Sequence, residues 1–385
     1  MNGLHILHLT TYLQGGAGRA ITDLACAQRA AGHQVTVVTS EHGVPGYDNY
    51  PEYLDRLRSS GVELHLVDSL FTRDLARNLR VVQQLRDGRH DDVDVIHAHA
   101  AVPALIGRLF SGHASRRISI VQTQHGWGSA KTPEQASMDL AILRDVDRVV
   151  TTSRATRELL VGLGAPRESV TVIPCGIPAD PSTRSARSGQ EPWHLLDPFW
   201  TRGARLIACV GTVNDNKNQR LVVEALPTLA GLDVVAVFIG EGGEALMGRA
   251  RELGVADRVV ACGYQPRAAE WLPLCDVAVV PSRTEGQGLI VLEAFRAGVP
   301  VVASSIPALA ELVEDGGTGL LFECDQVGGL ANAIRRAVSL SPGDRSALVA
   351  RAKARFLDGF TLDGMVSRHQ ALYRGLITKR ASLAA

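Results

Sequence analysis

The chain has 385 residues, of which 45% are apolar and 5% aromatic, and its 40 basic and 40 acidic side chains leave a formal net charge of zero. This length predicts two α/β domains of ordinary size. The interspersed charges exclude a basic nucleic-acid-binding surface, and no apolar run approaches the length of a membrane span. The six cysteines lie far apart without a C-x-x-C pair, which indicates a reduced, cytoplasmic protein.

Two segments bear on membrane contact. The apolar run Leu4–Leu9 is short and carries two histidines, so it predicts a strand and not a signal peptide. An arginine-rich segment, interrupted by two aspartates, favours a solvated helix face over a lipid-binding one. Its arginines are Arg73, Arg77, Arg80, Arg86 and Arg89. Peripheral contact at the inner face of a membrane stays open.

The first half of the chain alternates short apolar runs with helical or loop sequence, which predicts a parallel sheet with crossover helices. A glycine loop follows the first run, and a helix is expected at Ala20–Ala31. The predicted strands are Leu4–Thr10, Gln34–Thr39, Glu63–Val67, Val93–His97, Ile118–Thr123, Arg148–Thr151 and Val170–Ile173.

The segment Pro178–Pro192 interrupts this pattern with the composition of an exposed loop. A second series of strands is predicted at Leu206–Val210, Val234–Ile239, Val259–Cys262, Val277–Val280, Pro300–Ala303 and Gly319–Phe322, followed by a helix at Leu362–Thr378. We therefore expect an α/β protein of two doubly wound, Rossmann-like domains, residues 1–177 and 178–360, that face a deep cleft.

The glycines Gly15, Gly16 and Gly18 are the first candidate site. They would let backbone N–H groups approach a phosphate at the positive end of the following helix. A structural turn is the second interpretation. A dinucleotide-binding fingerprint with Glu41 as its acidic residue is the third, although the loop before Gly15 is longer than that fingerprint requires.

The loop Gly211–Asn218 is the second candidate, because it directly follows the first strand of the second series. Its Lys217 could neutralise a diphosphate, whose departure as a leaving group develops negative charge. Lysines are usually solvated, so the position after a strand is what favours a function.

The third candidate is a strand, a glycine-containing loop and a helix, Val277–Pro281, Ser282–Leu289 and Ile290–Ala297. Glu285 lies in the loop and Glu293 in the apolar helix. A buried carboxylate needs hydrogen-bond donors, and sugar hydroxyls are suitable ones. Gly286 and Gly288 would free backbone N–H groups for anionic oxygens. We expect one carboxylate to hold the hexose and the other the ribose of a nucleotide sugar.

The stretch Asp276–Pro300 resembles the signature of retaining glycosyltransferases with the two-domain GT-B fold, specifically family 4. The matching residues are Pro281-Ser282, Glu285-Gly286, Gly288-Leu289, Glu293-Ala294, Ala297-Gly298 and Pro300. Further matches over nearly the whole chain are Gly15-Gly16, Ile173-Pro174, Gly211, Lys217-Asn218, Gly263, Glu311, Thr318-Gly319 and Tyr373.

This resemblance implies the roles of the donor-site residues. The diphosphate would be bound by the backbone of Gly16 and by the loop with Gly211, Thr212 and Lys217. The transferred sugar would be held by Glu285 and by backbone N–H groups of Gly286, Gln287, Gly288 and Leu289. Glu293 would accept from the ribose, and the backbone near Gly263 and Tyr264 would meet the base. His125 would lie close to the reacting sugar, and the last helix, 361–380, would pack back on the first domain.

Three positions depart from the family pattern. Thr212 replaces a usual arginine, which removes one cation from the diphosphate site; Arg220 and Arg283 are candidates to replace it. Gln287 replaces a usual aromatic residue, and Cys175 a usual asparagine near the hinge.

Two further residue pairs are candidate sites. His97 and His99 could share a face as a metal pair, but no third ligand follows at suggestive spacing and the family needs no metal, so packing is favoured and no metal site is expected. Trp193 and Trp200 are expected to cover an apolar surface.

We therefore expect a glycosyltransferase that moves a hexose-type sugar from a nucleotide diphosphate donor with retention of configuration. His125, Lys217 and Glu285 would be the catalytic residues, no further cofactor would be required, and a UDP-sugar is favoured over a GDP-sugar. The first domain would bind the acceptor, which is a glycan, a lipid-linked molecule or a small molecule. Alternatives are a nucleotide-sugar epimerase and a sugar-nucleotide-binding protein with little turnover. No nucleic-acid partner is expected, and a homodimer stays open.

Overall fold

The computed structural model describes residues 3–88, 92–114, 116–128, 131–180 and 192–384. The chain divides into two compact units, Met1–Gly176 with Leu362–Ala385, and Ile177–Thr361. Ile177 is the first residue of the second unit, and its N–H donates to the carbonyl of Phe360 in the same unit at 3.1 Å. Most of the predicted exposed loop Pro178–Pro192, together with Arg89, lies outside the described residues.

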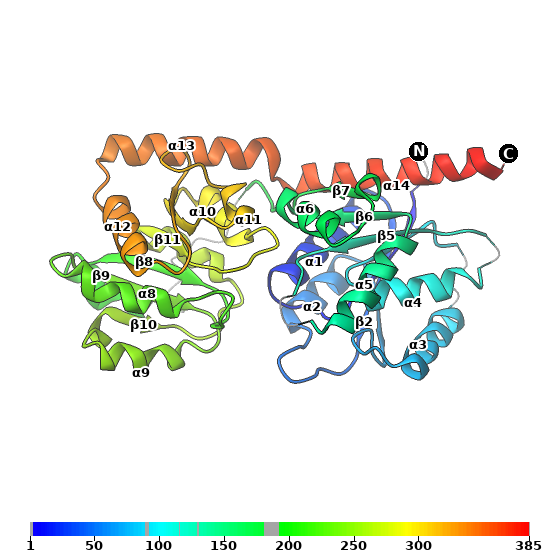
Figure 1. Cartoon of the computed structure of the whole chain (residues 1–385), viewed down its shortest axis with the longest axis horizontal. Helices are drawn as coiled ribbons and strands as arrows, with labels where there is room; N and C mark the ends of the chain where they lie inside the picture. The colour runs from blue at the N-terminus through cyan, green and yellow to red at the C-terminus, as the bar shows by residue number, and fades with distance from the viewer. Residues whose placement is uncertain (1–2, 89–91, 115, 129–130, 181–191, 385) are drawn as a thin grey trace. The chain divides into compact units, whose positions relative to one another are not determined.

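The first unit contains a seven-stranded parallel sheet in the order β3-β2-β1-β4-β5-β6-β7 (Figure 1). Its strands are β1 (His5–Leu9), β2 (Gln34–Ser40), β3 (Glu63–Val67), β4 (Val95–Ala98), β5 (Ser119–Gln124), β6 (Arg148–Thr151) and β7 (Val170–Val172). The strand order runs outward from β1 in one direction and from β4 in the other. This is a doubly wound sheet with its switch point between β1 and β4.

The α-helices in the described part of this unit are α1 (Gly15–Ala30), α2 (Pro51–Ser59), α3 (Leu75–Asp87), α4 (Ala101–Ser111), α5 (Pro133–Asp145), α6 (Arg154–Gly162) and α14 (Leu362–Ala384). Local sequence fixes several of their starts. The side chains of Asp74 and Ser153 accept hydrogen bonds at the N-termini of α3 and α6, and Thr132 and Gln135 form a capping box on α5.

The start of α1 differs from the prediction. The helix begins at Gly15 instead of Ala20, so the glycines form its first turn and not a loop. Gly18 packs against the preceding segment so closely that a Cβ atom there would lie 2.5 Å from the carbonyl carbon of Leu13. Glycine therefore permits a close approach of helix and backbone at this point.

The last helix, α14, packs on the first unit. It lies against α1 and β5. Tyr373 of α14 is fully buried, and Met365 accepts a hydrogen bond at its sulfur from the N–H of Gly176 at 3.2 Å. The first unit is thus built from two segments that are far apart in the sequence.

The second unit contains a six-stranded parallel sheet in the order β10-β9-β8-β11-β12-β13. Its strands are β8 (Arg205–Val210), β9 (Val234–Ile239), β10 (Val259–Ala261), β11 (Val277–Val280), β12 (Val301–Ser304) and β13 (Leu320–Phe322). Each strand predicted from the sequence is present in its unit, with ends that agree within about two residues.

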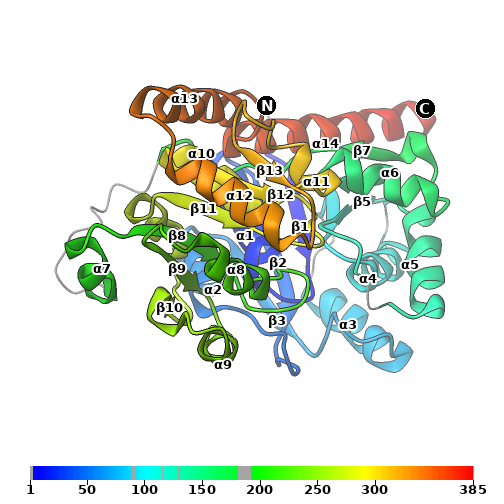
Figure 2. The same ribbon diagram turned by 60° about the vertical axis from the view of Figure 1, so that its left-hand side comes forward.

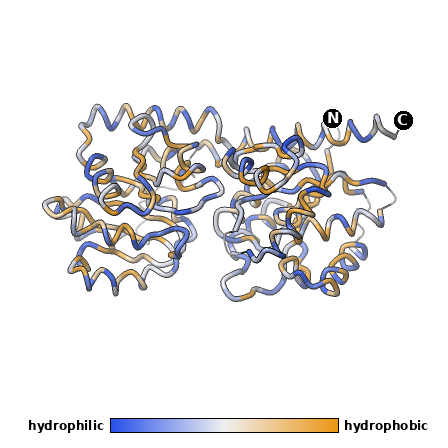
Figure 3. The backbone as a smooth tube through the Cα atoms, viewed as in Figure 1, coloured by the Kyte–Doolittle hydropathy of each residue, from blue (hydrophilic) through white to orange (hydrophobic). Residues whose placement is uncertain are grey.

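The helices of the second unit are α7 (Asp197–Thr201), α8 (Arg220–Ala225), α9 (Glu244–Glu252), α10 (Leu289–Ala297), α11 (Pro307–Ala310), α12 (Val327–Val338) and α13 (Pro342–Gly359). Residues of β9 alternate between two cores: Val235 and Val237 pack with α10 and α13, while Ala236 and Phe238 pack with α8, α9 and α12 (Figure 2). Both faces of the sheet are therefore covered, which explains why strands such as β9 and β11 are continuous apolar runs. Figure 3 shows the hydropathy of each residue along the backbone.

Candidate functional site

The loops after β8 and β11 form the candidate site of the second unit. These strands are neighbours in the sheet and mark the point where the strand order reverses. Ligands of open parallel sheets bind at the carboxyl ends of strands at such a switch point. Lys217 lies in the first of these loops and Glu285 in the second.

The side chains of Lys217 and Glu285 meet directly. The ammonium nitrogen Nζ of Lys217 lies 2.6 Å from Oε1 of Glu285. The hydroxyl of Ser282 donates to the same carboxylate oxygen at 2.8 Å. The lysine side chain is 33% exposed and the glutamate 10%, so the carboxylate is mostly buried while the cation still reaches solvent. A bound anion could therefore share the ammonium group with Glu285.

Hydrogen bonds between side chains and the backbone hold the loop that carries Lys217. The side-chain nitrogen Nε2 of Gln219 donates to the carbonyls of Gly211 and Thr212 at 3.1 and 3.0 Å, and the backbone N–H of Lys217 donates to Oδ1 of Asn214 at 2.9 Å. A Cβ atom on Gly240, at the end of β9, would lie 2.3 Å from the carbonyl oxygen of Gly211. The loop is thus fixed before any ligand arrives.

Both arginines considered as substitutes for the missing family arginine have partners in the protein. Arg283 bonds to Oδ1 of Asp325 at 2.8 Å and to the carbonyl of Asp215 at 3.0 Å, while Arg220 pairs with Glu224 at 2.9 Å. Arg283 therefore ties the β11 loop to the β8 loop in the described structure.

The remaining predicted donor residues lie around α10 and β10. Gly288, with φ +92°, starts α10, and Gln287 and Glu293 are 5% and 6% exposed. Gly263 follows β10 with φ +64°, and its carbonyl accepts from the N–H of Gly240 at 2.8 Å. The ring of Tyr264 is 37% exposed. Glu293 is thus a buried acid in an otherwise apolar stretch of α10.

In the first unit, Gly16 is exposed in the first turn of α1, and His125 is half-buried just after β5. His125 belongs to a cluster of histidines that the sequence did not identify as a group. Its members are His8, His97, His99, His125 and His369. The register of the sheet pairs His8 of β1 with His97 of β4. That pairing is the signal that could have found His8, because the doubly wound order predicts β1 beside β4.

The rings of this cluster are neutral. Burial lowers the pKa of His8, His125 and His369 to about 4, and that of His97 and His99 well below its usual value. A cavity of about 10 Å³ borders His97, His99, His125 and His369. The Nε2 atom of His369 is buried there without a protein partner, and a cavity of this size has room for one water molecule.

Within the described residues, His8, His97 and His99 form the one group that could hold a metal ion, since a ring nitrogen of each lies within 4.8 Å of the others. All six of their ring nitrogens already have hydrogen-bond partners. A cation bound to one nitrogen of each ring would break at least two of these hydrogen bonds. It would also be buried, and none of the hydrogen-bond partners of the three rings is a carboxylate that could balance its charge. The geometry favours a hydrogen-bonded cluster over a metal centre.

The tryptophans and cysteines considered in the sequence analysis have environments typical of packing residues. Trp193 packs on Trp271 with ring centroids 4.7 Å apart, and Trp200 is 39% exposed. All six cysteines are free, and burial raises the pKa of Cys175 and Cys209 to about 12, so these thiols stay protonated. Among the described helices, none combines the length and apolar character of a membrane span.

Comparisons with known proteins agree with this geometry. Residues 204–339 match the family model of glycosyl transferases group 1, and residues 14–181 match that of glycosyltransferase family 4. The GDP-mannose-dependent alpha-(1-6)-phosphatidylinositol monomannoside mannosyltransferase of Mycolicibacterium smegmatis is 30% identical over 300 residues, which cover 74% of this chain and 73% of that protein. A D-inositol 3-phosphate glycosyltransferase of Nocardia farcinica is 28% identical over 72% of this chain and 66% of its own length.

Solved structures share the fold. HepE from Anabaena, in complex with UDP and glucose, superposes with a TM-score of 0.80 at 19% identity, over 97% of this chain and all of that one (100%). A glycosyltransferase from Rickettsia africae gives a TM-score of 0.81 at 18% identity, over 98% of this chain and 100% of its own. The chain belongs to glycosyltransferase family 4 and has the two-domain GT-B fold.

Proposed function

We propose that this glycosyltransferase moves a hexose-type sugar from a nucleoside diphosphate donor to an acceptor hydroxyl with retention of anomeric configuration. The observation that carries the proposal is the contact of Lys217 with Glu285 at the switch point of the second sheet. A diphosphate needs a cation and a sugar needs hydrogen-bond acceptors, and this pair offers both side by side.

The second unit is the donor-binding unit in this proposal. Lys217 binds the diphosphate, in the loop with Gly211 and Thr212, and Glu285 accepts hydrogen bonds from hydroxyls of the transferred sugar. Backbone N–H groups at the start of α10 assist Glu285 in holding the transferred sugar. They belong to Gly286, Gln287, Gly288 and Leu289. Glu293 accepts from the ribose, and the segment at Gly263 and Tyr264 meets the base.

The first unit binds the acceptor and completes the reaction centre. Gly16 offers a backbone N–H to the donor phosphate from the first turn of α1. His125 presents its imidazole to the reacting sugar. The acceptor hydroxyl belongs to a glycan, a lipid-linked molecule or a small molecule; the two relatives above are named for inositol phosphate and phosphatidylinositol monomannoside acceptors.

A UDP-sugar is the favoured donor over a GDP-sugar. The solved HepE complex contains UDP and glucose, whereas the M. smegmatis relative is named GDP-mannose-dependent. Direct binding assays with both nucleotides decide between them.

The proposed reaction is a front-face displacement. The acceptor oxygen attacks the anomeric carbon while the bond from that carbon to the diphosphate breaks, and the acceptor proton passes to the leaving phosphate oxygen. Lys217 and the N–H of Gly16 stabilise the negative charge that develops on the leaving group, which is commonly a large part of catalysis.

The test is incubation of the purified protein with UDP-glucose or GDP-mannose and a panel of polyol and glycan acceptors. We expect NMR of the product to show the anomeric configuration of the donor. An inverted product contradicts the front-face mechanism. A parallel incubation without acceptor separates the rivals. A new nucleotide sugar in that sample indicates an epimerase, and donor binding without transfer in any sample indicates a binding protein.

A further inference from the structure

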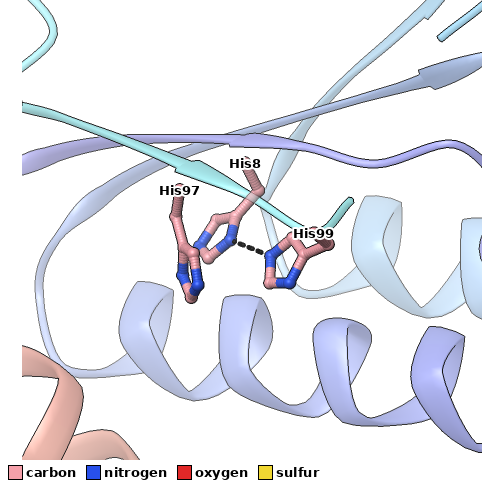
Figure 4. Close-up of side chains that lie close together, drawn as sticks. All are labelled: His8, His97 and His99. Carbon is pink, nitrogen blue, oxygen red and sulfur yellow. Dashed lines mark hydrogen bonds between the residues drawn. The ribbon is translucent and has the colours of Figure 1, made fainter. Parts of the chain in front are cut away.

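Seven buried or half-buried side chains of the first unit form one continuous series of hydrogen bonds, here called the relay. Its members in order are Thr123, His97, Tyr373, Gln28, His8, His99 and His125. They come from α1, β1, β4, β5, α14 and the segments after β4 and β5. Figure 4 shows the centre of the relay, where His8 and His99 bond to each other and His97 lies beside them.

The distances along the relay are those of ordinary hydrogen bonds. His125 Nε2 lies 3.1 Å from His99 Nδ1, and His99 Nε2 lies 3.0 Å from His8 Nδ1. Beyond His8, the Nε2 atom meets Oε1 of Gln28 at 2.7 Å. The amide nitrogen of Gln28 lies 3.4 Å from the hydroxyl of Tyr373.

The far end of the relay continues from Tyr373. Its hydroxyl lies 2.7 Å from Nδ1 of His97, whose Nε2 lies 2.7 Å from Oγ1 of Thr123. Each of these three histidines, His8, His97 and His99, therefore uses both ring nitrogens inside the relay.

One proton per ring makes the relay directional. A neutral imidazole has one N–H donor and one bare nitrogen that accepts. If one ring donates at Nε2, its Nδ1 must accept, so the next ring must donate to it. The tautomer of one histidine thus fixes that of every neighbour along the series, and the whole relay has two self-consistent proton arrangements that run in opposite directions.

In the orientation that its amide has in the structure, Gln28 corresponds to one of these two arrangements. Its amide nitrogen can only donate and its oxygen can only accept, and it is fully buried between His8 and Tyr373. With Oε1 toward His8, that ring donates from Nε2 and accepts at Nδ1. His99 then donates from Nε2 to His8, and His125 donates from Nε2 to His99.

The other branch runs in the same direction. The amide N–H of Gln28 donates to Tyr373, whose hydroxyl donates to Nδ1 of His97, and His97 donates from Nε2 to Thr123. All four histidines of the relay are therefore Nε2–H tautomers, and Nδ1 of His125 is left bare at the half-buried end.

We propose that Gln28 is a positioning residue that sets the tautomer of His125 through the relay. The consequence for the reaction rests on the proposed function, in which His125 contacts the transferred sugar. A bare Nδ1 accepts a hydrogen bond from a sugar hydroxyl, whereas it repels a carboxylate or phosphate oxygen at the same place. His125 thereby selects a ligand with a hydroxyl group there.

The relay is tested by nitrogen-15 NMR of the ligand-free protein at pH 7.5, with long-range proton–nitrogen correlations that distinguish the two tautomers of each ring. Expected are Nε2–H tautomers for His8, His97, His99 and His125. A single Nδ1–H tautomer among His8, His99 and His125 in the wild-type protein overturns the proposal. This measurement needs no variant and no substrate.

A pair of variants then isolates Gln28. Gln28→Met keeps the length of the side chain and removes the amide oxygen and nitrogen, so His8, His99 and His125 are expected to leave the pure Nε2–H state. Gln122→Met is the matched control, because Gln122 is equally buried in β5 and its amide bonds to Gln124, outside the relay. An unchanged tautomer pattern in Gln28→Met contradicts the positioning role.

Kinetics complete the test. Loss of one oriented hydrogen bond predicts a drop in kcat/KM of about tenfold for Gln28→Met and less than about twofold for Gln122→Met. Altered tautomers with unchanged kcat/KM refute the link between the relay and the reaction. If the wild-type protein transfers no sugar, the proposed function fails, while the NMR result still decides the relay.

Discussion

The ammonium group of Lys217 lies 2.6 Å from the carboxylate of Glu285, although the two residues are 68 positions apart in the sequence. Each comes from the end of a different strand, β8 or β11, and these strands are adjacent in the sheet. The free protein thus already holds an ammonium group beside a mostly buried carboxylate. Positioning of charged groups before the substrate arrives is what makes their later interaction with developing charge effective.

Removal of either partner is expected to slow transfer strongly. Lys217→Ala and Glu285→Gln should each lower kcat by about 10²- to 10³-fold. The first variant removes the preorganised cation that would face the developing negative charge, and the second removes the carboxylate charge that would face the sugar hydroxyls. Initial rates at saturating donor measure this. Lys353→Ala, an exposed lysine of α13, is the matched control and should keep full activity. Full turnover in Lys217→Ala or Glu285→Gln contradicts the site.

Nucleoside diphosphates are expected to stabilise the protein against heating. Selective binding to the folded state raises its stability by about 2.7 kcal/mol at a ligand concentration of 100 times Kd, so UDP and GDP can be ranked by their shift in Tm. Uridine without phosphates should give little shift. Lys217→Ala should lose most of the diphosphate-dependent shift, and an equal shift in this variant speaks against the lysine as the diphosphate ligand.

Gly288 is expected to tolerate no side chain. Its φ is +92°, and a Cβ atom there would lie 2.6 Å from Cδ2 of Leu309. Gly288→Ala should therefore lower the free energy of unfolding by about 1–3 kcal/mol and displace the N-terminus of α10, with weaker donor binding. Urea unfolding measures the first effect. The control is Gly248→Ala in α9, where the added methyl meets open space and should stabilise the helix by about 0.5–1 kcal/mol.

The histidine cluster predicts loss of stability in mild acid. Burial lowers the pKa of His8, His125 and His369 from 6.5 to about 4, so between these values the unfolded chain binds protons that the folded chain does not. The stabilisation is therefore complete above about pH 6.5 and is lost as the pH falls toward 4. Each neutral ring contributes a slope of up to about 1.4 kcal/mol per pH unit.

Urea unfolding between pH 7 and pH 5 measures this slope. His369→Gln should reduce it, whereas His194→Gln, at an exposed position, should leave it unchanged. A free energy of unfolding that is constant over this range contradicts the assignment of neutral buried rings.

The strands were predictable from the sequence because buried parallel strands are continuous apolar runs. Val234–Ile239 and Val277–Val280 occur as predicted, since every residue in them packs against helices on one face or the other. The start of α1 was not predictable in the same way. Glycines have low helix propensity, and only the close packing of Gly18 on Leu13 explains their place in the first helical turn.

The sequence suggested residues for the candidate site but could not predict the contacts between them. The glycine loops after strands singled out Lys217 and Glu285, yet nothing in the sequence fixes the distance between them. The relay was not predictable from the sequence, because Gln28 and Tyr373 lie 345 residues apart and no local pattern links them. Side-chain networks of this kind depend on the tertiary pairing of elements, which local periodicity does not encode.

Tyr373 also has a consequence for how the polypeptide is made. The first unit takes its final helix from residues 362–384, so its buried network cannot close until this segment has been synthesised. The unit encoded between the two segments is complete earlier, and domains commonly fold during synthesis in the order in which they emerge. Here the N-terminal segment must wait, with its sheet lacking α14, until residues 362–384 have left the exit tunnel.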